Sequence, residues 1–143
     1  MRRAEMKNSE KIELIKTCQD IYFDKFINDP NENIRAMVAR YGRYEDRIRL
    51  MHDESYLVRL EIIKRGEFKI IRQMLDDSDD RIRAEIVRWS RDTDEFLNRY
   101  VHDPSERVRL EVARWGREQD LKELENDISY KVRYMVQLHA SRK

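Results

Sequence analysis

Five copies of one aspartate and arginine pair constrain the fold of this chain more than any other feature. In each copy an Asp is followed by an Arg six positions later, and successive copies start 24, 24, 26 and 24 residues apart. A fixed period of this size is typical of stacked repeat proteins, because one such unit is too small to bury its own apolar face. The pairs are Asp29 and Arg35, Asp53 and Arg59, Asp77 and Arg83, Asp103 and Arg109, and Asp127 and Arg133.

Each repeat begins with the pattern of a long helix. In the copy at 103–116 we expect Asp103 to cap the helix start, Pro104 to take its first position and Gly116 to end it in the left-handed conformation. Apolar residues recur at the i, i+4, i+7 spacing of one buried stripe, at Val108, Val112 and Trp115.

A shorter apolar segment follows each long helix and has the length of about two helical turns. We interpret it as a short helix, partly 3₁₀, that packs on the long one. The sequence therefore predicts an all-α fold, an α-solenoid of about five long-helix and short-helix repeats in a single domain over 1–143. The repeats start at 29, 53, 77, 103 and 127, residues 1–28 form an N-terminal capping segment, and residues 12–17 are its expected helix.

These repeats resemble a known family. The pattern Asp-x-x-x-x-(Val/Ile)-Arg looks like that of HEAT-like repeats, and the period of about 24 is closer to their leucine-rich repeat variant; DPNENIRAMVARYG and DPSERVRLEVARWG are the best copies. The resemblance covers about residues 22–140 and implies a right-handed superhelix with an Asp and Arg ladder along the stack. The family often begins its second segment with Pro, whereas this chain has GRYEDRIR, GEFKIIRQ and GREQDLKE there. Function does not follow, because this scaffold serves many partners.

The charge balance limits the partners that the whole chain can attract. Charged residues make up 41% of the sequence, but 30 Lys and Arg nearly cancel 29 Asp and Glu, for a net charge of +1. A protein that holds a polyanion through its overall field is usually more basic.

The single cysteine, Cys18, cannot form an intramolecular disulfide and is expected to be a small buried residue. With no long apolar run either, we expect a cytoplasmic protein without a membrane segment.

Two rows of cations recur along the repeats. We interpret the row of paired arginines, Arg35 to Arg133, as a structural ladder in which each guanidinium reaches the capping Asp or carbonyls of a neighbouring turn; a ligand-binding row is the alternative. The second row is Arg40, Lys64, Arg88 and Arg114. Glu61, Glu85 and Glu111 stand three residues before its last three members, so a self-neutralised solvated face competes with a phosphate-binding stripe.

Two tryptophans share one position near the ends of long helices. We interpret Trp89 and Trp115 as core residues, as most such aromatics are. Partial exposure is the alternative, because Arg65 and His139 hold the equivalent position in other repeats. The two-residue insertion in the series also follows Trp89, and insertions in repeats often map to a binding face. We therefore predict a partner-binding surface at Arg88, Trp89, Arg91, Arg114 and Trp115.

No motif in the sequence indicates catalysis. We identify no catalytic residue, metal site, cofactor or small-molecule substrate. The sequence favours a non-catalytic protein-interaction scaffold whose partner is another protein. The alternative is nucleic-acid binding through the phosphate backbone, because some HEAT-like DNA repair proteins carry aromatic and basic faces. A more distant alternative is a maturation chaperone that holds another protein's cofactor.

Overall fold

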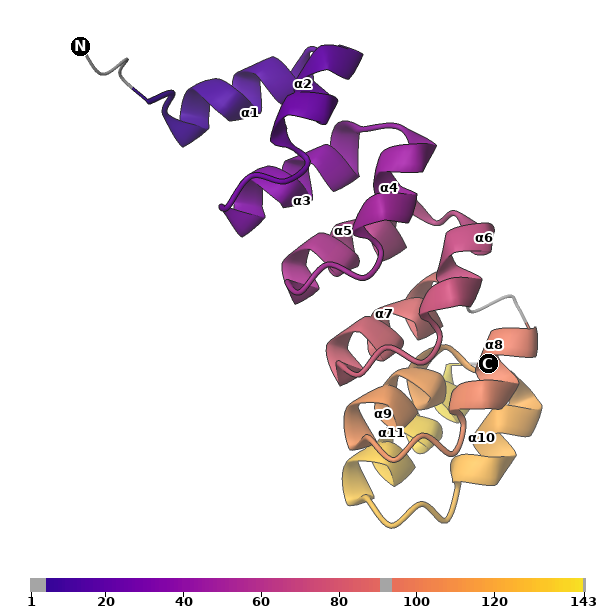
Figure 1. Cartoon of the computed structure of the whole chain (residues 1–143). Helices are drawn as coiled ribbons and strands as arrows, with labels where there is room; N and C mark the ends of the chain where they lie inside the picture. Colours follow the sequence, from indigo (N-terminus) through magenta and orange to yellow (C-terminus); the bar gives the residue numbers. More distant parts are fainter. Residues whose placement is uncertain (1–4, 91–93, 143) are drawn as a thin grey trace. The chain divides into compact units, whose positions relative to one another are not determined.

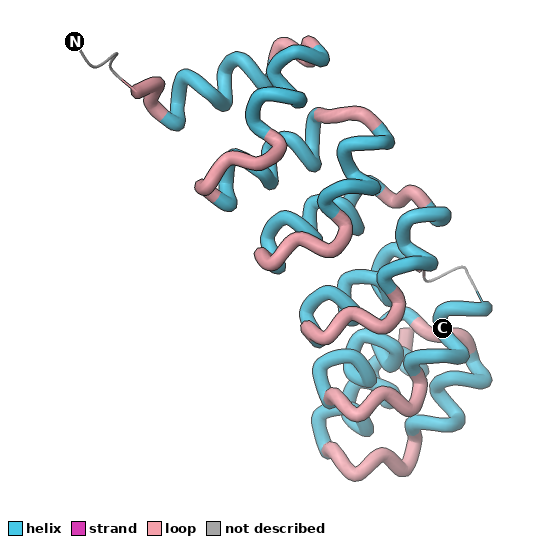
Figure 2. Tube along the Cα trace, viewed as in Figure 1, coloured by secondary structure: helices cyan, strands magenta, loops and turns pink. Residues whose placement is uncertain are grey.

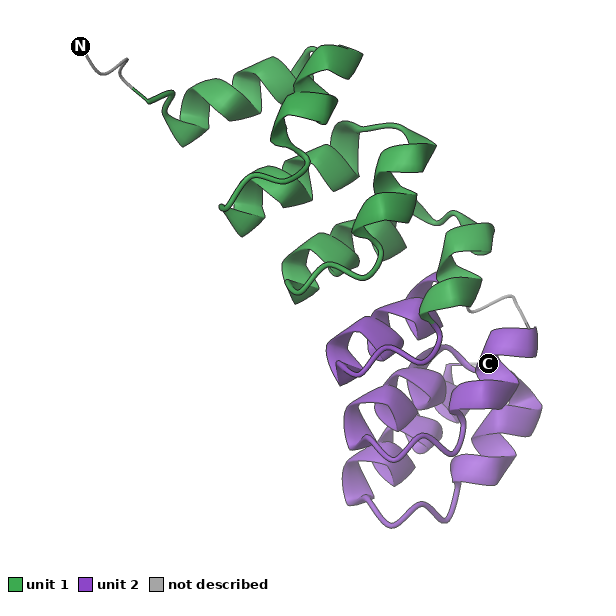
Figure 3. Cartoon of the chain, viewed as in Figure 1, with its two compact units in different colours: residues 1–74 green, residues 75–143 purple. Residues whose placement is uncertain are grey.

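The computed structural model of the chain describes residues 5–90 and 94–142, which form helices joined by short turns (Figure 1). These residues contain eleven α-helices, one 3₁₀ turn and no strand (Figure 2). The expected all-α class is confirmed. The chain divides into two compact units, residues 1–74 and 75–143 (Figure 3).

The first unit alternates longer and shorter helices. Helix α3 contacts α1 on one side and α5 on the other, while the short helix α2 contacts α1 and α3, and α4 contacts α3 and α5. The bounds are α1 (Asn8–Lys16), α2 (Asp20–Phe26), α3 (Glu32–Tyr41), α4 (Tyr44–Leu50), α5 (Tyr56–Arg65), α6 (Phe68–Ile71) and the 3₁₀ turn Arg72–Met74. Its core includes Ile15, Phe23, Ile34, Val38, Val58 and Ile62.

The second unit has the same alternation. Helix α9 contacts α7 and α11, and the short helices α8 and α10 pack beside the long helices that precede and follow them (Figure 1). The bounds are α7 (Asp80–Trp89), α8 (Asp94–Tyr100), α9 (Glu106–Trp115), α10 (Glu118–Leu124) and α11 (Tyr130–Ser141). Its core includes Ile82, Ile86, Phe96, Leu97, Val108, Val112 and Val132.

The short apolar segments are helices, as expected. Four of them are continuous α-helices of seven residues, and one continues from α6 into the 3₁₀ turn Arg72–Met74. The amino-terminal helix begins earlier than the expected 12–17, because α1 starts at Asn8.

The expected helix start at Asp103 and Pro104 is wrong by two residues. Helix α9 begins at Glu106 with Ser105 in the N-cap position, and the Asp103 carboxylate accepts a hydrogen bond from the Ser105 amide at 2.8 Å. The carboxylate therefore fixes the turn before the helix rather than the helix end itself. Asp29, Asp53, Asp77 and Asp127 accept from the amide two residues ahead in the same way.

The expected left-handed end of the long helix holds at only one of the three glycines. Gly66 has φ 74°, whereas Gly42 and Gly116 are extended, with φ −75° and −69°. At these two positions glycine is required by close approach, because a Cβ would lie 2.4 Å from the Val38 carbonyl oxygen at Gly42 and 2.5 Å from that of Val112 at Gly116.

The prediction that Cys18 is buried is also wrong. Cys18 lies in the turn between α1 and α2, its side chain is exposed, and its φ of 58° is unusual for a residue with a side chain. Position within a turn overrides the usual tendency of a free cysteine to be buried.

None of the described helices is both long enough and apolar enough to span a bilayer.

Candidate functional site

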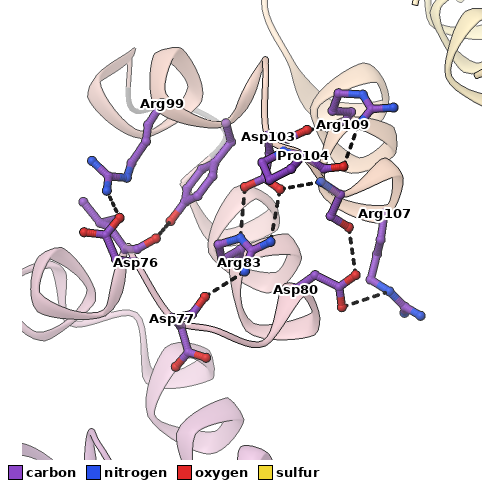
Figure 4. Close-up of polar contacts among 12 residues, drawn as sticks. Asp76, Asp77, Asp80, Arg83, Arg99, Asp103, Pro104, Arg107 and Arg109 are labelled. Atoms are coloured by element: carbon purple, nitrogen blue, oxygen red, sulfur yellow. Dashed lines mark hydrogen bonds and ion pairs between the residues drawn. The ribbon is translucent and has the colours of Figure 1, made fainter. Parts of the chain in front are cut away.

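The paired arginines connect neighbouring long helices (Figure 4). Arg83 on α7 donates through Nε to Asp103 Oδ2 at 2.9 Å and through Nη2 to Asp103 Oδ1 at 3.1 Å. Its Nη1 donates to the carbonyl oxygen of Asp77, the Asp of its own repeat, at 2.8 Å. The Arg83 guanidinium thus contacts two successive turns, and the Asp103 carboxylate that it binds also stabilises the turn before α9.

The same geometry recurs in both units. Arg35 grips Asp53 at 2.9 and 3.0 Å, and Arg109 grips Asp127 at 2.8 and 3.2 Å. Lys11 replaces the arginine at the first turn and reaches Asp29 at 2.7 Å. Arg59 and Arg133 donate to the carbonyl oxygens of Asp53 and Asp127 in their own repeats. In Arg35, Arg83 and Arg109 the carboxylate contact therefore joins the Arg to the Asp of the following repeat.

The electrostatics of these pairs favour the charged forms. The Asp53 hydrogen bond raises the pKa of Arg35, and the Asp103 hydrogen bond raises that of Arg83, in each case against the opposing effect of burial. Burial alone would raise the pKa of Asp127, but hydrogen bonds from Arg109 and the Ser129 amide hold it below its ordinary value. These ion pairs are satisfied structural contacts.

A second set of buried carboxylates was not predicted from the sequence. Asp46 and Asp120 are almost fully buried at the third positions of α4 and α10. Asp46 Oδ2 accepts from the Arg43 amide at 2.8 Å and from its Nε at 2.9 Å, and Asp120 receives the same two bonds from Arg117. Burial would raise the pKa of Asp46, but the Arg43 side chain and amide lower it below the ordinary range.

The sequence signal for this second set is Gly-Arg-x-x-Asp. It occurs at 42–46 and 116–120, and each glycine leaves room for the carboxylate four residues later, since a Cβ on Gly42 would lie 2.9 Å from Asp46 Oδ2. Beside it, Arg47 is buried and donates to the Gly42 carbonyl and to Glu67. Within the described residues every buried side-chain nitrogen and oxygen has a hydrogen-bond partner.

Three residues of the predicted partner-binding surface lie together on α7 and α9. Arg88, Trp89 and Trp115 line one depression of about 290 Å³ together with Glu85. Trp89 is 48% exposed and Trp115 is 37% exposed, so the core interpretation and the place of Trp115 in a buried stripe are wrong, and the alternative of partial exposure is correct. Arg91 lies outside the described residues. We call Arg88, Trp89, Arg114 and Trp115 the tryptophan surface.

Each tryptophan of this surface is held by a glutamate on its own helix. Trp89 Nε1 donates to Glu85 at 3.0 Å, and Trp115 Nε1 donates to Glu111 at 3.1 Å. The same glutamates pair with Arg88 and Arg114, both at 3.4 Å. Their side chains are only 15% exposed, whereas those of Arg88 and Arg114 are 53% and 38% exposed. The carboxylates are therefore mostly covered, whereas the indole rings and guanidinium groups are exposed to solvent.

The equivalent surface of the first unit has a different composition. Arg40, Glu61, Lys64 and Arg65 line a depression of about 340 Å³, with Arg65 in the position that a tryptophan holds on α7 and α9. Arg40 lies over the ring of Tyr41 at 5.4 Å from its centre. The cations of the predicted row thus lie beside polar side chains in the first unit and beside tryptophans in the second.

The described residues contain no group of three or more His, Cys, Asp or Glu side chains arranged to hold a metal ion. The acidic run at 76–80 instead orders a helix start: Asp79 accepts from the Arg81 amide at 2.9 Å, and Asp80 accepts from the Ser105 hydroxyl at 2.8 Å. Comparison of the chain with protein-family models, with curated proteins and with solved structures finds no match.

Proposed function

We propose that this chain is a non-catalytic protein-interaction scaffold in which each compact unit is a stack of α-solenoid repeats. The serial contacts of α1, α3 and α5, and of α7, α9 and α11, support such stacks. The Arg35–Asp53, Arg83–Asp103 and Arg109–Asp127 pairs link long helices that are adjacent in the series. A stack of this kind offers a partner its surface rather than a reactive cleft.

The observation that carries the proposal is the exposure of two tryptophans beside two arginines. Tryptophan and arginine are enriched at the centres of protein interfaces, where large rigid side chains lose little conformational entropy on binding. A side chain such as tryptophan stabilises a fold mainly when buried, so two half-exposed copies in equivalent positions of α7 and α9 indicate a surface used for contact. Because the guanidinium groups lie outermost, the partner segment should carry acidic as well as apolar side chains.

The test is capture with the whole chain and with a variant that lacks both rings. Trp89→Ala with Trp115→Ala should lose a protein that the unaltered chain retains, and the purified partner should bind the unaltered chain at least tenfold more tightly than the variant. Tyr44→Ala is the matched control, because Tyr44 is a 42% exposed aromatic in the other unit. Circular dichroism must show that all three proteins are equally folded. Equal retention by the double variant would contradict the proposal.

Nucleic-acid binding is the second candidate, and the same side chains favour it. Bases stack on exposed tryptophan rings while arginines contact phosphates. The pairing of Arg88 with Glu85 and of Arg114 with Glu111 weakens this alternative, because each cation is already partly neutralised. If it is correct, single-stranded DNA or RNA should bind with an affinity that falls steeply between low and moderate salt. Absence of a shift at low salt would leave the protein partner as the better proposal.

A further inference from the structure

The outer face of α11 combines exposed aromatic side chains with a guanidinium that donates one hydrogen bond within the described residues. Tyr130 and Tyr134 are 68% and 59% exposed, and Ile128, in the turn before the helix, is 93% exposed. Arg133 lies between the two tyrosines in sequence and donates through Nη1 to the Asp127 carbonyl oxygen. We call Ile128, Tyr130, Arg133 and Tyr134 the α11 face.

Arg133 occupies the position that grips a carboxylate elsewhere in the chain. Arg35, Arg83 and Arg109 each donate through Nη1 to the carbonyl of their own Asp, and each uses Nε and Nη2 to hold the next Asp. Arg133 repeats the first contact, which orients its guanidinium in the same way. Its Nε and Nη2 edge is left for a carboxylate from outside the described residues.

The tyrosines change the chemistry of this face relative to the earlier helices. Tyr134 stands seven residues after its Asp, the position of the buried Ala36 and Ala84 on α3 and α7. Tyr130 stands three residues after its Asp, where Glu32 and Asp80 accept hydrogen bonds from Ser55 and Ser105. The α11 face therefore keeps the arginine that contacts the next helix elsewhere. A tyrosine takes the position of the acid, and a second tyrosine takes that of the alanine.

The charge of α11 specifies the partner further. The helix Tyr130–Ser141 contains Lys131, Arg133 and His139 but no Asp or Glu. We propose that the α11 face docks a protein segment in which an aspartate in a turn precedes a helix, with the aspartate bound by the Nε and Nη2 edge of Arg133 and apolar side chains packed on the tyrosines. This interaction is separate from the one proposed for the tryptophan surface.

A peptide from the chain itself is the most direct probe. Residues 101–116 form the turn and helix that dock on Arg83 through Asp103, so a labelled peptide of this sequence presents the proposed chemistry. It should bind the whole chain saturably in fluorescence anisotropy, and Asp103→Asn in the peptide should weaken binding about tenfold or more. Arg133→Gln in the chain should have the same effect, and the two changes together should cost little more than either alone.

Two further variants separate this contact from simple attraction of charge. Lys131→Gln removes one positive charge from the same helix and should change the affinity less than threefold. Tyr134→Ala should weaken binding through lost apolar contact, while Trp89→Ala with Trp115→Ala should leave it unchanged. An equal loss for Lys131→Gln and Arg133→Gln would overturn the proposal.

Because a short isolated peptide forms helix poorly, the same segment is also joined to the carboxyl end through a flexible linker. The Arg133 and Asp103 substitutions should then lower the melting temperature non-additively, since docking is intramolecular. Absence of coupling in both formats would overturn the proposal. Self-association of the chain that is abolished by Tyr134→Arg would show that a second copy occupies the face, and would also overturn it.

Discussion

Arg109 and Asp127 form a two-bonded ion pair across 18 residues of sequence, with Nε to Oδ2 at 2.8 Å and Nη2 to Oδ1 at 3.2 Å. The same Asp127 carboxylate accepts from the Ser129 amide at 2.9 Å and so shapes the turn before α11. This double use explains why both residues recur at a fixed spacing: the carboxylate is needed by its own turn and by the preceding helix.

Replacing one arginine of these pairs should destabilise the fold. Arg83→Ala removes three hydrogen bonds and leaves the 7% exposed Asp103 side chain without its cation, so we expect a loss of about 2 kcal/mol in the free energy of unfolding. The melting temperature should fall by about 5 °C or more. Arg88→Ala, which truncates a mostly exposed side chain on the same helix, is the control and should change it little. Equal melting of both variants would contradict this assignment.

The loss of folding stability at acidic pH should depend on Asp127. Its pKa is lowered in the folded state, so its contribution is fully present above the unfolded-state value of about 4 and is lost as the pH falls through the folded-state value. Asp127→Asn should therefore be less stable than the unaltered chain at pH 7, and the difference should shrink as the pH falls below about 4. Urea unfolding between pH 7 and pH 3 measures it. Glu125→Gln, an exposed neighbour, should show no such convergence.

Gly42 and Gly116 should resist substitution for a reason other than their backbone angles. Both are extended, but an added Cβ would lie within 2.5 Å of a carbonyl oxygen of the preceding helix turn. Gly116→Ala should cost about 1–3 kcal/mol, because the chain must shift to relieve this overlap. The comparison is Gly66→Ala, where φ is 74° and the expected cost of about 1–2 kcal/mol comes from the left-handed backbone. A structure of Gly116→Ala should show displaced α10, and unchanged coordinates with unchanged stability would contradict the explanation.

The tryptophan fluorescence of the chain, excited at a wavelength that tyrosine does not absorb, should report on the tryptophan surface. The sequence contains two tryptophans, and both belong to that surface. Their emission in the free protein should be quenched by iodide, since both rings are partly exposed. Binding of a partner to this surface should shift the emission to shorter wavelength and reduce quenching. Iodide-resistant emission in the free protein would show that the rings are buried.

The helices were predictable because apolar residues recur at helical spacing and each repeat supplies independent evidence for the others. The helix starts were displaced by two residues because Asp was interpreted as the cap, whereas it forms the preceding turn and the N-cap position falls two residues later, at Ser105 in α9. The prediction also did not separate left-handed Gly66 from extended Gly42, because it overlooked the Gly-Arg-x-x-Asp pattern that places the Asp46 carboxylate against Gly42 and that Gly66 lacks.

The exposure of the two tryptophans was one of two alternatives that the sequence left open, and the polar contacts around them were predictable only in part. Equivalent positions holding Trp, Arg and His indicated partial exposure of Trp89 and Trp115, and the structure has them partly exposed. The i, i+3 spacing also indicated the Glu85–Arg88 pair, but not that Glu85 would bind the indole as well. The buried Asp46 and Asp120 were missed because aspartate is rarely buried, and only the Gly-Arg-x-x-Asp pattern signals the arginine that permits it.

Because each aspartate contacts both its own turn and the preceding helix, the folding of one repeat is coupled to that of the next. In the second unit Asp103 and Asp127 each tie a turn to the helix before it, so ordering of α7 prepares the turn of α9, and ordering of α9 prepares that of α11. Neighbouring repeats therefore lower one another's entropic cost of folding, which is the condition for nearest-neighbour cooperativity along a one-dimensional array.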